Sequence, residues 1–129
     1  RGDMSAIYNK LSMCDWIDAN ECTDADEKKL LQNNALQNAE KAFRLAVELD
    51  REGDRAFAGF AVLEYARINS NWPLIDEVGK KIDDEELWQI VLSSYAKSRV
   101  LEECKNLKGK GEWKWLESLQ AKVSTSMDG

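Results

Sequence analysis

The stretch DEKKLLQNNALQNAEKAFRLAVELD, residues 26–50, decides the fold class of this chain. Small or apolar side chains recur in it every three or four positions, which is the spacing of one face of an α-helix. The acids of its first turn, after an expected N-cap at Thr23, suit the positive end of the helix dipole. The residues on this face are Leu31, Ala35, Ala39, Ala42, Ala46 and Leu49.

The length of this helix raises a question about the shape of the molecule. From Asp24 to Asp50 it would extend about 40 Å at 1.5 Å per residue, more than the width of a compact domain of this size. Either Asn33 and Asn34 interrupt it, because Asn side chains compete for backbone hydrogen bonds, or the molecule is elongated.

The residues after this helix predict a helical hairpin. Glu52, Gly53 and Asp54 supply a glycine for a helix end and a new N-cap, so the next helix should return antiparallel through a short loop. That next helix contains AFAGFAVLEYARI, residues 56–68, which carries few charges. We expect it to be central and buried on most sides.

The remaining segments also have helical spacing. Residues 5–20 carry a stripe of Ile7, Leu11, Cys14 and Ile17, which we expect to face the core. Helix starts follow at Asn71-Trp72-Pro73 and at Asp83–Glu86, and the helix from Asp83 should continue past Tyr95 until Gly109 and Gly111. The sequence thus predicts one all-α domain over residues 1–129, with about six helices in stacked antiparallel hairpins or an irregular bundle. Residues 1–4 are interpreted as an expression-vector remnant and residues 124–129 as a frayed tail.

Composition and charge restrict the class of protein. The 129 residues are 43% hydrophobic and 33% charged, which is typical of a globular chain and too hydrophobic for a disordered one. The net charge of −6 argues against general affinity for nucleic acid. Three cysteines with no CxxC spacing favour a cytoplasmic location. No apolar run approaches the roughly 18 residues that span a bilayer, so no membrane partner is expected.

Catalytic and metal-binding patterns are not found in the sequence. The chain has no histidine, which removes the usual general base and the commonest zinc ligand. The acids from Asp18 to Asp26 fail the register of a calcium loop, and those at Asp83–Glu86 suit a solvated helix start. Each cysteine is interpreted as a small hydrophobic residue. We therefore expect no enzyme activity, no cofactor and no metal; an enzyme that uses a cysteine or carboxylate remains the least favoured alternative.

The segment KGKGEWKWLESLQ, residues 108–120, lies in the only clearly basic part of the chain. From Lys97 to Lys122 there are seven basic residues against four acids. Tryptophans among lysines could stack on bases while the amines hold phosphates. Alternatively, Trp113 and Trp115, three and four positions before Leu116 and Leu119, anchor the last helix on the core. We favour anchoring and keep nucleic-acid contact as the alternative.

Two fragments resemble tetratricopeptide-type repeats. Trp88 and Tyr95, seven apart with Val91 and Leu92 between them, are similar to the first-helix signature of that family, and Ala39, Phe43 and Ala46 are similar to the second. No 34-residue period runs through the chain. Leu92 replaces the small residue of the first helix, and Cys104 and Lys108 replace the alanine and aromatic of the second. The resemblance implies a stack of α-hairpins whose concave side receives a peptide or a partner helix.

These observations lead to two functional hypotheses. The first is a non-catalytic protein–protein interaction, scaffold or adaptor domain, which binds another protein or peptide or forms a homo-oligomer. The alternative is binding of RNA or single-stranded DNA through the basic, tryptophan-containing segment. The candidate partner-binding residues are Trp72, Trp88, Lys105, Lys108, Lys110, Trp113, Lys114 and Trp115.

Overall fold

The computed structural model describes the backbone of residues 2–128 and the side chains of residues 4–126. This described part contains seven helices and no strand, which confirms the all-α fold. Residue 1 of the expected vector remnant and residue 129 of the expected frayed tail lie outside it. The helices are α1 (Gly2–Glu21), α2 (Ala25–Glu48), α3 (Glu52–Ile68), α4 (Trp72–Lys81), α5 (Glu85–Ser94), α6 (Lys97–Leu107) and α7 (Lys114–Asp128).

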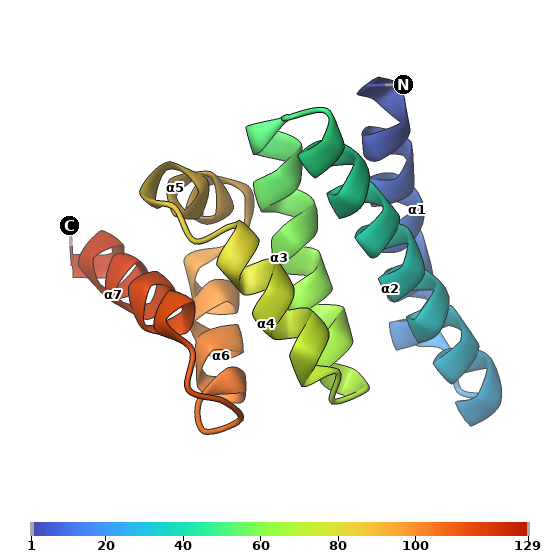
Figure 1. Cartoon of the computed structure of the whole chain (residues 1–129). Coiled ribbons are helices and arrows are strands. Elements are labelled where there is room, and N and C mark those ends of the chain that lie inside the picture. The colour runs from blue at the N-terminus through green and yellow to red at the C-terminus, as the bar shows by residue number, and fades with distance from the viewer. Residues whose placement is uncertain (1, 129) are drawn as a thin grey trace.

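The helices form a row of antiparallel pairs (Figure 1). The pair α1/α2 occupies one end, α3/α4 the middle, and α6/α7 the other end, while α5 lies across the row and is seen nearly along its axis. Helix α3 packs against α2, α4 and α5, and α7 packs against α4, α5 and α6. The two ends of the row therefore consist of different helix pairs.

Helix α2 is continuous through Asn33 and Asn34. Neither amide interrupts the helix, and the side chain of Asn33 instead accepts a hydrogen bond from Asn69 Nδ2 at 3.3 Å. The N-cap is Asp24, one residue beyond the expected Thr23, and its carboxylate accepts from the backbone N–H of Asp26 at 2.9 Å. Of the two possibilities left open by the sequence, the uninterrupted helix is the correct one.

The α2–α3 hairpin is confirmed, but its turn does not use the expected glycine. Asp50 has a φ of 53°, and the N–H of Arg51 donates to the carbonyl of Ala46 at 2.9 Å. Asp50 thus takes the left-handed position that glycine commonly fills, a conformation that Asp tolerates better than most residues. Gly53 lies inside the first turn of α3, where no left-handed residue is needed.

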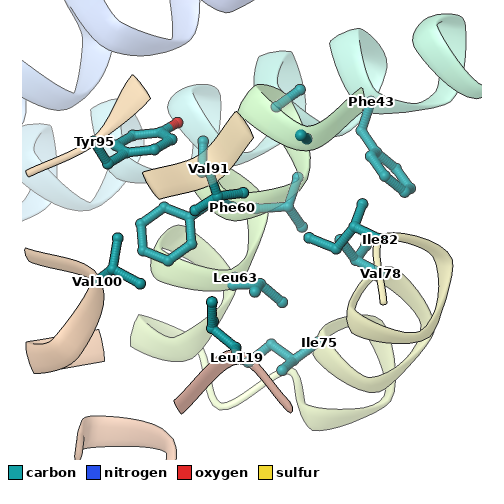
Figure 2. Close-up of a cluster of buried hydrophobic side chains, with 14 of the residues drawn as sticks. Phe43, Phe60, Leu63, Ile75, Val78, Ile82, Val91, Tyr95, Val100 and Leu119 are labelled. Atoms are coloured by element: carbon teal, nitrogen blue, oxygen red, sulfur yellow. The ribbon is translucent and has the colours of Figure 1, made fainter. Parts of the chain in front are cut away.

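Helix α3 is the centre of the core, as predicted from its sequence. Every residue from Ala58 to Ala66 is buried, Glu64 included. Figure 2 shows its Phe60 and Leu63 among side chains from α2, α4, α5, α6 and α7. The labelled neighbours include Phe43, Ile75, Val78, Ile82, Val91, Val100 and Leu119.

The prediction of a single helix from Asp83 toward Gly109 is wrong, because the helix is interrupted at Tyr95 and Ala96. Tyr95 is extended, with a φ of −121° and a ψ of 150°. Its hydroxyl donates to the carbonyl of Phe57 at 2.7 Å, and its ring stacks on Phe57 with centroids 5.0 Å apart. The break divides the expected helix into α5 and α6 and turns α6 alongside α3.

Two ion pairs connect α6 with α3. Arg67 Nε donates to Glu103 at 2.7 Å, and Arg99 donates to both carboxylate oxygens of Glu64, at 2.6 and 2.8 Å. Both glutamates are buried, and the carboxyl group of each accepts hydrogen bonds from an arginine on the facing helix. The pairs fix the register of α6 on the central helix.

Candidate functional site

Three of the predicted site residues meet where α7 packs on α4. The ring centroids of Trp72 and Trp113 are 6.3 Å apart, and those of Trp113 and Trp115 are 5.2 Å apart with nearly parallel planes. Trp72 begins α4, Trp113 lies in the loop before α7, and Trp115 is in the first turn of α7. We call these three residues the tryptophan corner.

Glycines explain how the corner packs. A Cβ on Gly79 would lie 2.1 Å from the indole ring of Trp115, so this ring lies directly on the backbone of α4. Trp115 is 2% exposed, and its Nε1 donates to Asp76 at 3.3 Å. A Cβ on Gly111 would likewise lie 2.4 Å from the ring of Trp113. Trp115 is thus a core residue that anchors α7, whereas Trp72 and Trp113 are half-buried.

Of the predicted lysines, Lys108 and Lys114 line the cavities beside Trp113, and these cavities are not purely basic. Lys105, Lys108, Lys110 and Lys114 are exposed. Two cavities that share Trp113, with volumes of about 560 Å³ and about 500 Å³, are lined by acids as well as lysines. These acids are Asp76, Asp83, Glu112 and Glu117.

Trp88 does not join the tryptophan corner. It is 2% exposed within α5, and its Nε1 donates to Asp83 at 3.1 Å. It borders a separate cavity of about 430 Å³ between α5 and α7. A partner would meet little of this ring, so Trp88 serves packing in the observed fold.

Helix α1 presents a second surface, which was expected to face the core. Its inward face consists of small and polar residues, and Ser5, Ser12 and Ala19 are each at most 1% exposed. The Ser5 hydroxyl donates to the carbonyl of Ala42 at 3.0 Å, and the Ser12 hydroxyl to that of Ala35 at 2.7 Å. Helix α1 is therefore held to α2 by its small, partly polar face.

The isoleucine, leucine and methionine side chains of α1 are exposed, whereas Tyr8 and Trp16 pack against the core. The prediction that the stripe of Ile7, Leu11 and Ile17 is buried is wrong, because these side chains are 46%, 47% and 52% exposed. Met4, Met13 and Cys14 are exposed as well. We call Met4, Ile7, Leu11, Met13, Cys14 and Ile17 the α1 stripe.

A matching pattern of small residues accounts for this orientation. Helix α2 turns a row of alanines toward its neighbours, and this row can approach another helix closely only if the facing side chains are also small. In α1 the facing positions recur at intervals of four and three, parallel to the alanine row. They are Ser5, Asn9, Ser12, Trp16 and Ala19, of which Ser5 lies opposite Ala42 and Ser12 opposite Ala35; Trp16 is the one large side chain among them, and it stacks on Tyr65 of α3. This repeat was the available sequence signal, and hydrophobicity alone pointed to the opposite face.

An aromatic cavity adjoins the α1 stripe on the side toward α3. The rings of Trp16 and Tyr65 stack with centroids 4.2 Å apart. The cavity measures about 100 Å³, and the stripe residues Met13 and Ile17 are on its rim. We call it the aromatic notch; it is lined by Met13, Trp16, Ile17, Phe57, Tyr65, Tyr95 and Arg99.

The titratable groups offer little reactive chemistry. Burial raises the pKa of Cys104 to about 12, so its thiol is protonated and a weak nucleophile near neutral pH. Burial also raises the pKa of Tyr65 to about 12. Within the described residues, no three His, Cys, Asp or Glu side chains gather in a way that could hold a metal ion.

Comparison with protein-family models, curated proteins and solved structures finds no match to this chain. No family is identified, and the resemblance to tetratricopeptide-type repeats stays a prediction. Among the described helices, none has both the length and the apolar character needed to cross a bilayer.

Proposed function

We propose that this chain is a non-catalytic interaction domain that binds another protein through the α1 stripe. The observation that carries this proposal is the outward orientation of Ile7, Leu11 and Ile17. Single exposed apolar residues are normal on a protein surface, but a continuous row along one helix is typical of a site that another protein covers. The free Cys14, Cys22 and Cys104 support placing the domain in a reducing compartment such as the cytoplasm.

Affinity capture from an extract of the native host tests this proposal. The wild-type chain is compared with the double variant Ile7→Lys, Leu11→Lys and with Leu30→Lys as the matched control. Leu30 is 60% exposed on α2, on the side opposite its buried alanine row. All three chains should fold equally well, because none of the changed side chains is in the core.

We expect wild type and Leu30→Lys to capture a host protein that the double variant does not capture. If the double variant retains the same proteins as wild type, the α1 stripe is not the binding surface and the proposal fails.

Binding of RNA or single-stranded DNA remains the alternative, supported by the exposed Lys108, Lys110 and Lys114 beside Trp113. The acids that line the same cavities would repel phosphates, so we favour protein binding. Charge reversal at Lys108 and Lys110 separates the two functions. A nucleic-acid domain would retain single strands at low salt and lose them in this variant; an interaction domain that uses α1 would retain none in either form.

A further inference from the structure

The α1 stripe and the aromatic notch form one continuous surface. Met13 and Ile17 belong to both, since they are exposed on α1 and also lie on the rim of the notch. The notch is walled on its far side by Phe57 of α3 and by Tyr95 at the α5–α6 break. A partner that lies along α1 therefore meets an apolar ridge with a cavity beside it.

The notch is large enough for one apolar side chain. Its volume of about 100 Å³ is roughly three times the volume of a water molecule in the liquid. Two sets of contacts make its walls rigid. The rings of Trp16 and Tyr65 stack on each other. The guanidinium of Arg99 lies 4.9 Å from the centre of the Tyr95 ring and is hydrogen-bonded to Glu64. Preformed aromatic pockets of this kind are where the strongest contacts of an interface concentrate.

The length and spacing of the stripe suit a helix. The stripe residues Ile7, Leu11, Cys14 and Ile17 follow one face of α1 for about 15 Å at 1.5 Å per residue, with Met4 and Met13 on its two flanks. Exposed ridges at intervals of three and four residues pack against the corresponding grooves of a second helix. An extended peptide would find no unpaired backbone along α1, because a helix satisfies its own hydrogen bonds.

The charge around the stripe specifies the partner further. Among the described residues from Met4 to Lys29 there are six acids and three bases, and all six acids lie between Lys10 and Lys28. Asp18 and Glu21 are exposed at the carboxyl end of α1, directly beyond the apolar row. A second copy of this chain is a poor partner for this surface. If two α1 helices paired in parallel, their acidic ends would repel each other; if they paired antiparallel, each acidic end would face only Lys10 of the other helix. The acids are Asp15, Asp18, Glu21, Asp24, Asp26 and Glu27.

From these observations we infer that the α1 stripe receives an amphipathic helix of another protein, with basic residues at the end that lies beside Asp18 and Glu21. One large apolar side chain of this helix fills the aromatic notch. The inference rests on the proposed function and adds the chemical class of the partner. Charge complementarity sets the direction of the bound helix, because the apolar stripe alone would accept either direction.

Fluorescence anisotropy with two synthetic peptides tests this inference. The probe is an amphipathic peptide of about 16 residues, long enough to match the stripe, with leucine every third or fourth position and flanking lysines. The second peptide is identical except that glutamate replaces each lysine. Both peptides are titrated with three proteins: the wild type, the double variant Asp18→Lys/Glu21→Lys, and the matched control Glu112→Lys/Glu117→Lys. The control changes two exposed acids at the α7 end of the molecule. Leu11→Ser is paired with Leu30→Ser.

Wild type should bind the lysine peptide at least tenfold more tightly than the glutamate peptide. The double charge reversal at Asp18 and Glu21 should lower the affinity for the lysine peptide about tenfold, equivalent to 1.4 kcal/mol. Leu11→Ser should lower this affinity by a similar factor, and both control variants should bind the peptide as wild type does. Equal binding of the two peptides, no binding of either, or equal effects of both charge reversals would overturn the inference. Sedimentation gives a further test. If wild type is a dimer and Leu11→Ser is a monomer, the stripe binds a second copy of this chain and the inference is wrong.

The two proposals fail in different ways. If the host extract yields a stripe-dependent partner but the peptides show no dependence on charge, the domain still binds protein and only the basic helix is wrong. If no partner depends on Ile7 and Leu11, the proposed function itself is wrong.

Discussion

At the scale of single residues, the contact between Trp115 and Gly79 makes the clearest prediction. Replacing Gly79 with Ala should destabilise the protein by about 1–3 kcal/mol, because the added methyl group would overlap an indole ring that is fixed in the core. Helix propensity alone would give the opposite sign, since Ala is favoured over Gly by about 1 kcal/mol within a helix.

Gly53→Ala is the matched control, because nothing lies within 4 Å of the Cβ it would add. Urea unfolding of the two variants should show a lower midpoint for Gly79→Ala and an unchanged or higher midpoint for Gly53→Ala. Stabilisation in both variants would mean that Trp115 does not lie on α4.

A second prediction at this scale concerns Glu103 and pH. Burial raises the pKa of Glu103 to about 7 in the folded state, against the opposing effect of its hydrogen bond from Arg67. The folded protein therefore holds a proton that the unfolded chain releases near pH 4.5, and the contribution of this group is greatest below that pH. As pH rises from 4.5 to about 7, the free energy of unfolding should fall by on the order of 2 kcal/mol relative to Glu103→Gln. Denaturant titrations of both chains across this range measure the difference; a difference that stays constant or grows contradicts the raised pKa.

At the scale of helices, α1 has the opposite orientation to the one that its hydrophobicity predicts. Ser12→Leu should destabilise the protein by about 1–3 kcal/mol, because the larger side chain has no room against Ala35 and the hydroxyl's hydrogen bond is lost. Leu11→Ser, one position away, should change stability by less than about 1 kcal/mol, since Leu11 is already half exposed. Thermal unfolding followed by circular dichroism compares the two, and a larger loss for Leu11→Ser would place the stripe in the core.

The errors in predicting helices have a common physical cause. Local patterns predicted where most helices begin, because capping by Asp84 and Asn71 depends on neighbouring residues only. The break at Tyr95 has no glycine or proline to signal it, and it depends on a hydrogen bond to Phe57, 38 residues away. The orientation of α1 depends in the same way on the alanines of α2. Both features depend on contacts between segments that are far apart in the chain, and such contacts could not be inferred from the local sequence pattern.

At the scale of the whole molecule, the all-α class, the central position of α3 and the α2–α3 hairpin were predictable from spacing and composition. The candidate site was predictable only in part. The positions of Trp113 and Trp115 ahead of Leu116 and Leu119 indicated an anchor, and Trp115 is one. Neither the addition of Trp72 to this corner nor the separation of Trp88 from it could be inferred, because both depend on how α4 and α5 pack on α7. The α1 stripe was visible as a pattern, but its exposure was not.

The account depends most on the claim that the apolar face of α1 is open to solvent, and thiol labelling of the native protein tests it most directly. Cys14 lies on this face and is exposed, whereas Cys104 is 1% exposed within α6. A small alkylating reagent, with the modified sites identified by mass spectrometry, should modify Cys14 at nearly the rate found in urea and leave Cys104 unmodified until the protein unfolds. If Cys14 in the native monomer is protected as strongly as Cys104, the stripe is buried and the proposed binding surface does not exist.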